Sequence, residues 1–203
     1  MEDIFTHIYE NHKWGDNQCT EYKGSSGPGS EIEYNQAYIQ FLKTFILDHT
    51  IKSVVDLGCG DFRYGVSIYE DLEVRYTGYD AYQKMVKCHA SHYDSPKYTF
   101  RHLEFSNHVD KIESGDLCIL KDVLQHWRLE KIYLFLDALI ESKKFKYILI
   151  CNCCYQSKDN TTIRSGDFHF LSCDYLPLKK YNPVKVFHYH SKEVCIIDLS
   201  KRI

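Results

Sequence analysis

The sequence predicts an α/β fold in which a mainly parallel sheet carries helices on both faces. Short apolar runs alternate with longer amphipathic segments along most of the chain, as expected where helices connect parallel strands. The first of these runs ends in an acid and a Gly-x-Gly turn, within residues 53–61. Two β-rich runs close the chain and predict an antiparallel hairpin after the parallel strands.

The apolar runs give the positions of the strands. Five parallel strands are expected at residues 53–57, 74–79, 98–103, 117–120 and 147–151. The closing hairpin joins residues 184–190 to residues 194–199 through a short polar turn. Together these runs predict seven strands.

Three helices are expected between the strands or ahead of them. Two of them cover residues 82–91 and 129–142. A third is expected to begin near Ser30, because Ser30 and Glu33 have the Ser-x-x-Glu form of a capping box. The apolar side of this helix consists of Ile32, Ala37, Ile39, Phe41, Leu42, Phe45 and Ile46.

Length and composition predict a single globular domain. A chain of 203 residues with 44% hydrophobic and 26% charged residues suits one domain with one core. We expect residues 31–203 to form this core and residues 1–30 an N-terminal arm. The net charge of −3 argues against broad nucleic-acid binding, which depends on clustered Lys and Arg, but does not exclude a local basic patch.

Hydropathy and cysteine usage predict a cytoplasmic protein. No stretch approaches the roughly 20 apolar residues of a membrane span, and the start of the chain lacks the features of a signal peptide. Nine scattered cysteines predict reduced thiols rather than a disulfide framework. Residues 151–154, with His169 or Cys173, offer a zinc alternative, but they lack paired Cys-x-x-Cys units, so we expect no metal site.

The most informative motif is the run from Val54 to Asp61, Val-Val-Asp-Leu-Gly-Cys-Gly-Asp, followed by a second acid at Asp80. Gly58 and Gly60 allow a tight turn and a close approach to a bound ligand. Asp80 lies twenty positions after Gly60, at the end of the next apolar run. Nucleoside-binding α/β folds place the carboxylate that binds a ribose there, so the motif predicts a nucleoside-containing cofactor.

Two features of this loop disfavour a dinucleotide. The third glycine of a Gly-x-Gly-x-x-Gly fingerprint would fall at residue 63, which is Arg63. Asp56 and Asp61 place two carboxylates where a pyrophosphate would lie. Like charges about 4 Å apart cost on the order of 4 kcal/mol at a partly solvated site. S-adenosylmethionine, which is cationic and has no phosphate, fits this loop better.

The run at Val54–Asp61, together with Tyr76-Thr77-Gly78-Tyr79-Asp80, resembles the first two motifs of the class I S-adenosylmethionine-dependent methyltransferases. The resemblance implies a Rossmann-like, seven-stranded and mainly parallel sheet with a C-terminal antiparallel hairpin. It covers residues 31–203. One departure is Phe62, at a position where the family often has a further glycine.

The resemblance also implies contacts with the cofactor. Gly58, Cys59 and Gly60 would wrap its methionine part, while Asp80 and the adjoining Ala81 would hold the ribose. A carboxylate that closes a buried strand requires a partner, and for Asp56 we expect the ammonium of the cofactor, directly or through water.

Residues after the third and fourth strands extend this site. Glu104 and Phe105 follow the third strand, where the family contacts the adenine; the alternative is a surface acid beside a core phenylalanine. Lys121, Asp122 and Val123 follow the fourth strand, and the resemblance places them at the methionine end of the cofactor.

His126 is the candidate general base. Methyl transfer to a hydroxyl requires alignment at roughly 3–3.5 Å and removal of a proton. An imidazole with a pKa near 6.5 is mostly neutral at pH 7 and ready to accept that proton. If a helix begins near Val123, Asp122 would be an i, i+4 neighbour and could orient the ring. The alternative is that Asp122 caps this helix while His126 packs beside Trp127.

Two segments are candidates for acceptor binding. Trp14 precedes a turn-rich run at residues 24–30, and similar segments occur in bacterial and large-virus methyltransferases that lie among sugar genes. We expect a lid over the acceptor pocket, with Trp14 stacking on a ring, or alternatively an arm packed on the core. As a lid, residues 1–28 are dispensable for cofactor binding and required for transfer.

The second candidate is the long segment between the fifth strand and the hairpin. It contains Arg164 for an anionic group, and Asp167 and His169 for a hydroxyl, although such residues are often simply solvated. Trp127, after the fourth strand, is a further candidate contact with the acceptor.

The sequence therefore predicts an S-adenosylmethionine-dependent O-methyltransferase that acts on a small polar acceptor, such as a sugar or nucleotide-sugar, and releases S-adenosylhomocysteine. The alternatives are an RNA or protein methyltransferase and a non-catalytic cofactor-binding partner subunit. Magnesium, used by some sugar methyltransferases of this fold, is not supported, because Asp122 has no convincing second carboxylate beside it.

Overall fold

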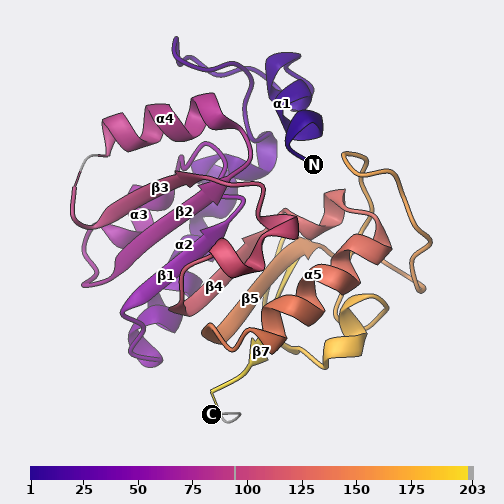
Figure 1. Cartoon of the computed structure of the whole chain (residues 1–203). Helices are drawn as coiled ribbons and strands as arrows, with labels where there is room; N and C mark the ends of the chain where they lie inside the picture. The colour runs from indigo at the N-terminus through magenta and orange to yellow at the C-terminus, as the bar shows by residue number, and fades with distance from the viewer. Residues whose placement is uncertain (94, 201–203) are drawn as a thin grey trace. The chain divides into compact units, whose positions relative to one another are not determined.

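The computed structural model describes residues 1–93 and 95–200 (Figure 1). The chain forms two compact units, Met1–Glu104 and Phe105–Ile203, hereafter the first unit and the second unit.

The first unit contains three parallel strands in the order β3-β2-β1. These are β1 (Ser53–Leu57), β2 (Arg75–Asp80) and β3 (Tyr98–His102). The register pairs Leu57 with Tyr79 and Asp80 with His102, so the three strands end at the same edge of the sheet. This edge therefore carries the Gly-x-Gly turn and Asp80. Ligands of open α/β sheets bind at this edge, outside the carboxyl ends of the strands.

Four α-helices belong to the first unit. They are α1 (Glu2–Glu10), α2 (Ile32–Asp48), α3 (Gly65–Tyr69) and α4 (Gln83–His92). Helix α4 packs on β2 and β3, and α2 packs on α3 (Figure 1). Met85, Val86 and His89 form the buried side of α4, which follows the i, i+3, i+4 spacing of a helix face.

The capping-box prediction for α2 is wrong. The helix begins at Ile32 with Glu31 as its N-cap, and no side chain caps it. The hydroxyl of Ser30 instead donates to the carbonyl of Gly27 at 2.7 Å, because residues 28–30 form a separate 3-10 turn, η1 (Pro28–Ser30). The predicted apolar face is confirmed for Ile39, Leu42, Phe45 and Ile46, whereas Ile32 and Ala37 are exposed.

The second unit contains the remaining strands, in the order β4-β5-β7-β6. Strands β4 (Gly115–Lys121) and β5 (Phe145–Cys153) are parallel. Strand β7 (Lys192–Asp198) runs antiparallel to β5, and β6 (Val184–Tyr189) runs antiparallel to β7. The buried face of α5 (Leu129–Glu141) consists of Ile132, Phe135, Leu136 and Leu139. Short 3-10 turns complete the unit: η2 (Phe105–Asn107), η3 (Val109–Lys111), η4 (Leu124–His126) and η5 (Leu178–Tyr181).

The strand order along the sheet is β3-β2-β1-β4-β5-β7-β6. This confirms the predicted α/β fold, with seven strands, a mainly parallel sheet and a closing antiparallel hairpin. Cys118, Cys151 and Cys195 are at most 1% exposed, which confirms that these thiols lie in the core. Within residues 1–93 and 95–200, no helix has the length and apolar character needed to cross a membrane.

Candidate functional site

The Gly-x-Gly turn after β1 requires glycine at both positions. Gly58 and Gly60 have φ values of 86° and 55°, in the left-handed region that other residues rarely adopt. A Cβ at Gly60 would lie 2.4 Å from Oγ of Ser26, which belongs to the N-terminal arm. The turn is therefore tight in its backbone and covered closely by the arm.

The four backbone N–H groups of residues 58–61 all donate to acceptors within the protein. The acceptors are the Tyr79 carbonyl (2.8 and 3.1 Å), Asp80 Oδ2 (3.1 Å) and Ser26 Oγ (2.9 Å). Glycine-rich loops bind phosphates through such N–H groups. Because these donors are already used, the loop does not form a phosphate cradle.

Asp80 is the buried carboxylate at the end of β2. Its Oδ1 accepts from the N–H of Tyr82 at 3.0 Å, and its Oδ2 accepts from the N–H of Gly60. Burial raises the pKa of Asp80, while these backbone donors oppose the rise. The backbone of Ala81 is a further partner, and a carboxylate offers about four acceptor sites, so Asp80 keeps capacity for a hydroxyl donor. The adjoining Ala81 is also buried.

Asp56 has a partner inside the protein. The hydroxyl of Tyr76, a buried residue of β2, donates to Asp56 Oδ2 at 2.9 Å. The carboxylate of Asp56 is therefore hydrogen-bonded to the neighbouring strand, so it does not depend on a cofactor for a hydrogen-bond partner.

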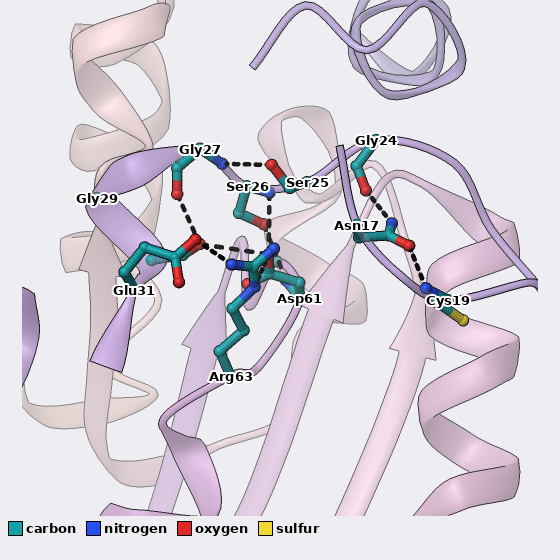
Figure 2. Close-up of polar contacts among 12 residues, drawn as sticks. Asn17, Cys19, Gly24, Ser25, Ser26, Gly27, Gly29, Glu31, Asp61 and Arg63 are labelled. Carbon is teal, nitrogen blue, oxygen red and sulfur yellow. Dashed lines mark hydrogen bonds and ion pairs between the residues drawn. The ribbon is translucent and has the colours of Figure 1, made fainter. Parts of the chain in front are cut away.

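Asp61 requires a correction to the charge argument made from the sequence. Its carboxylate lies 3.0 Å from Nε of Arg63 and accepts from the N–H of Ser26 at 3.0 Å. Figure 2 shows this group, with Arg63 between Asp61 and Glu31. Arg63 therefore offsets the charge of Asp61, and the repulsion expected against a phosphate is weaker. The hydrogen bonds of the loop N–H groups are the stronger argument.

The N-terminal arm forms part of this site. The ring of Tyr9 stacks on Tyr82 with centroids 4.7 Å apart, and its hydroxyl lies 2.8 Å from Ser26 Oγ. Trp14 contacts Tyr9 edge-on at 5.7 Å and is only partly exposed. These contacts attach the arm to the glycine loop, as in the alternative in which the arm packs on the core.

The structure accommodates Phe62 at the position where the family often has glycine. Its φ of 53° lies in the left-handed region, which is why glycine is common there. Its ring is buried, and a Cβ at Gly65 would lie 2.0 Å from it. Gly65 leaves room for the ring, and packing against Tyr76 and Phe100 offsets the backbone strain.

His89 is a site residue that the sequence reasoning missed. It lies on the buried face of α4, and its Nε2 donates to the carbonyl of Gly60 at 3.0 Å. Burial lowers the pKa of His89, which keeps the ring neutral. The signal in the sequence was its spacing from Met85 and Val86 on an otherwise apolar helix face.

The second unit holds the other predicted site residues, at the end of β4. Asp122 has a φ of 60° and is flanked by two ammonium groups. Lys121 Nζ lies 2.6 Å from its Oδ2, and Lys192 Nζ contacts its Oδ1. Although burial opposes the shift, these two cations lower the pKa of Asp122. Asp122 is therefore held as a carboxylate and is not a proton acceptor near neutral pH.

His126 is oriented by a different partner from the one predicted. Residues 124–126 form the 3-10 turn η4, so Asp122 and His126 are not helical i, i+4 neighbours. The Nδ1 of His126 lies 3.0 Å from the carbonyl oxygen of Asp167 and must donate to it. This leaves Nε2 as the basic nitrogen. Burial lowers the pKa of His126, so the ring is neutral at pH 7.

The loop after β5 is attached to the same turn by its backbone. The N–H of Gly166 donates to the His126 carbonyl at 2.8 Å, and the N–H of His169 donates to the Gln125 carbonyl at 3.0 Å. Arg164 and Asp167 are exposed on this loop. His169 is 8% exposed, and in the described part of the chain neither ring nitrogen makes a well-formed hydrogen bond. Burial lowers the pKa of His169, and the nearby backbone of Leu124 opposes this shift.

Two predicted contacts with ligands are core residues in the structure. Trp127 is 1% exposed and packs on Phe135 and Phe105, with centroids 5.2 and 5.8 Å apart. Phe105 is 6% exposed in the same cluster, as in the core alternative. Glu104, predicted near the adenine, and Val123, predicted near the methionine end of the cofactor, are partly exposed.

The described residues contain no group of three or more His, Cys, Asp or Glu side chains that could hold a metal ion.

Comparison with known proteins gives a fold but no close relative. No family model matches the chain, and no curated protein matches its sequence. Among solved structures, an O-methyltransferase family protein from Burkholderia thailandensis is 12% identical with a TM-score of 0.60, over 82% of this chain and 56% of that one.

Two further structures extend this similarity. The N-terminal domain of EvdMO1, solved with SAH and D-fucose, is 11% identical with a TM-score of 0.60, over 87% of this chain and 85% of that one. The 16S rRNA methylase ArmA is 14% identical with a TM-score of 0.55, over 81% and 83%. The chain has the fold of the class I S-adenosylmethionine-dependent methyltransferases.

Proposed function

We propose that this protein is an S-adenosylmethionine-dependent methyltransferase that acts on a hydroxyl group of a small polar acceptor. The observation that carries the proposal is the glycine loop, whose four N–H groups at residues 58–61 are already bonded within the protein. On a methyltransferase fold, this loop and the buried Asp80 suit a nucleoside cofactor without phosphate.

The first unit would hold the cofactor. Asp80 would accept from the ribose, because a carboxylate offers about four acceptor sites and the backbone donors of Gly60, Ala81 and Tyr82 leave capacity for a hydroxyl. The turn at Gly58, Cys59 and Gly60 would lie along the methionine part, since glycine permits the closest approach of a ligand to the backbone. Asp56, Ala81 and Glu104 complete this proposed set in the first unit. Lys121, Asp122 and Val123, the other proposed contacts with the cofactor, belong to the second unit.

When bound, S-adenosylmethionine supplies a methyl group already activated by its sulfonium. The protein then has to orient the acceptor and take its proton. His126 would accept this proton at Nε2, because Nδ1 donates to the Asp167 carbonyl. Lys121 and Lys192 keep Asp122 ionised, and its negative charge favours the imidazolium that His126 becomes.

The acceptor is proposed to be a sugar or nucleotide-sugar bound by the loop after β5. His169 supports this, because a buried imidazole without a partner is costly unless a ligand satisfies it. Arg164 and Asp167 are exposed on the same loop and can bind an anionic group and a hydroxyl. Trp14 remains a candidate contact through its exposed part.

RNA is the second candidate acceptor, because a 16S rRNA methylase has the same fold with similar coverage. The net charge of −3 favours the small acceptor, since RNA binding depends on clustered cations. A non-catalytic cofactor-binding subunit is distinguished by turnover alone.

The test is a thermal-shift assay followed by an acceptor screen. S-adenosylmethionine and S-adenosylhomocysteine are expected to raise the Tm, and NAD is not. Transfer of labelled methyl is then measured on nucleotide-sugars, simple sugars, rRNA fragments and a peptide mixture. Stabilisation by NAD alone would overturn the cofactor assignment, and transfer to RNA alone would overturn the small acceptor.

A further inference from the structure

Two cysteines meet where the N-terminal arm contacts α4. The Sγ atoms of Cys19, on the arm, and Cys88, on α4, lie 3.7 Å apart. Both side chains are partly exposed. The two residues are far apart in the sequence, so their contact depends on the arm being docked as the structure has it.

The position of Cys19 is defined by the arm itself. Its N–H donates to Oδ1 of Asn17 at 2.6 Å, and Nδ2 of Asn17 donates to the Gly24 carbonyl (Figure 2). Both thiols pack on the edge of the cluster that joins the arm to α4, which consists of Tyr9, Tyr22, Tyr82 and Met85. The thiols therefore mark the border of the arm's main apolar contact.

We propose that Cys19 and Cys88 form a reversible disulfide that fastens the N-terminal arm to α4. The oxidant is a low-molecular-weight disulfide such as oxidised glutathione. The Cys19 thiolate attacks one sulfur of this disulfide, whose S–S bond breaks and releases one glutathione thiolate. The Cys88 thiolate then attacks the Cys19 sulfur and releases the second glutathione. Two protein thiols are oxidised, and one glutathione disulfide is reduced to two thiols.

The order of these steps follows from the two environments. Burial, with Glu21 and Cys19 nearby, raises the pKa of Cys88 to about 12, so Cys19 meets the oxidant first. The closeness of the sulfurs then favours the second step, because the reaction is intramolecular. A bond of about 2.05 Å requires the sulfurs to approach each other, and Cys19 lies in a loop that can adjust.

A disulfide between the arm and α4 would also hold Ser26 of the arm against the glycine loop. Ser26 of the arm is bonded to Asp61 and lies against Gly60. The disulfide is thus a covalent version of a contact that otherwise depends on aromatic packing and hydrogen bonds. This inference concerns the arm and its thiols and does not depend on the reaction that the protein catalyses.

The test uses the full chain, treated with oxidised glutathione and analysed by peptide mapping without reduction. The expected product is a peptide pair joined through Cys19 and Cys88, which dithiothreitol separates. Trypsin cleavage after the exposed Lys23 is expected to slow on the order of tenfold, because cleavage follows local opening of the arm.

Two variants keep the result interpretable. In C88S, Cys19 is expected to retain a glutathione adduct and the cleavage rate to stay that of the reduced protein. C154S removes a partly exposed thiol elsewhere and is expected to leave the crosslink unchanged. Separate glutathione adducts on Cys19 and Cys88, or no modification of either in the folded protein, would overturn the proposal.

Discussion

The N-terminal arm, which contains α1, and the loop after β5 are both long segments outside the strands, yet they are attached in different ways. The arm, residues 1–30, is attached by side chains: Tyr9 stacks on Tyr82, and Ser26 bonds to Asp61. The loop, residues 154–183, is attached to the turn at Gln125 and His126 largely by backbone hydrogen bonds. Three of its aromatic side chains are exposed: Tyr155 at 66%, Phe168 at 46% and Phe170 at 38%.

This difference indicates a supporting role for the arm and a role in ligand recognition for the loop after β5. In the arm, Tyr9 stacks on Tyr82 and Ser26 is hydrogen-bonded to Asp61 of the glycine loop. The exposed side chains of the loop after β5 can serve a ligand, because backbone hydrogen bonds of Gly166, His169 and Leu171 hold this part of the loop in place. We therefore expect the arm to support cofactor binding and the loop to select the acceptor. Deletion of residues 1–28 is now expected to impair cofactor binding as well as transfer, in contrast to the prediction from the sequence.

Removal of the Tyr9 ring is expected to have the largest effect. Tyr9→Ala empties the stack on Tyr82 and is expected to lower the free energy of unfolding by about 3–5 kcal/mol, as for other buried aromatic residues. Phe168→Ala removes a comparable ring that is exposed and is expected to stay within about 0.5 kcal/mol of wild type. Urea unfolding of both variants measures the difference. Equal losses would show that the two segments are attached alike.

Removal of the proposed base tests the loop side of the comparison. His126→Gln is expected to lower kcat by about 10²–10⁴-fold, the usual contribution of general base catalysis. Binding of S-adenosylhomocysteine is expected to be unchanged in calorimetry. His188→Gln, on an exposed face of β6, is the matched control and is expected to keep full activity. An active His126→Gln enzyme would remove His126 from the mechanism.

A side chain at the glycine turn tests the contact between the arm and the loop. Gly60→Ala is expected to cost at least about 1–2 kcal/mol through its left-handed backbone alone. Its Cβ would also meet Ser26 Oγ at 2.4 Å. In Gly60→Ala/Ser26→Gly this clash is removed, so the double variant is expected to be more stable than the sum of the single effects. Simple additivity would mean that the arm does not press on the turn.

The smallest effect is a pH dependence of stability that arises from three histidines, on α4, in η4 and in the loop after β5. Burial lowers the pKa values of His89, His126 and His169 below 6.5 in the folded protein. The unfolded chain therefore binds more protons as the pH falls through 6.5, and stability decreases in that direction. The urea midpoint is expected to fall between pH 7.5 and 5.5, and less so in His89→Gln. A midpoint that rises on acidification would contradict the burial of these rings.

Local patterns predicted the framework of the fold well. The run at 53–57 is bounded by a polar turn and a glycine, so β1 was predicted with its observed ends. The start of α2 was predicted wrongly. Ser30 belongs to the 3-10 turn η1, and the Ser-x-x-Glu pattern does not distinguish such a turn from a helix N-cap. Helix α1 was not expected, although Ile4, Phe5, Ile8 and Tyr9 lie at helical spacing, because the segment is only nine residues long and has no capping signal.

The local geometry of the candidate site was predictable where short motifs specify it. Gly58, Gly60 and Asp80 lie as their motifs indicated. The partner of Asp61 is Arg63, whose side chain had to fold back onto the loop, and the partner of His126 is a carbonyl 41 residues away. Such pairs depend on tertiary packing, so residue spacing alone predicted Asp122 in place of the Asp167 carbonyl.

The central claim is that the glycine loop and Asp80 bind a nucleoside cofactor without phosphate. Calorimetric titration with S-adenosylhomocysteine and, separately, with NAD tests it most directly, in the wild type and in Asp80→Asn. We expect one S-adenosylhomocysteine per chain, affinity reduced at least about tenfold in Asp80→Asn through the lost charge-assisted hydrogen bonds, and no binding of NAD. Binding of NAD, or equal affinity of the variant for S-adenosylhomocysteine, would contradict the account.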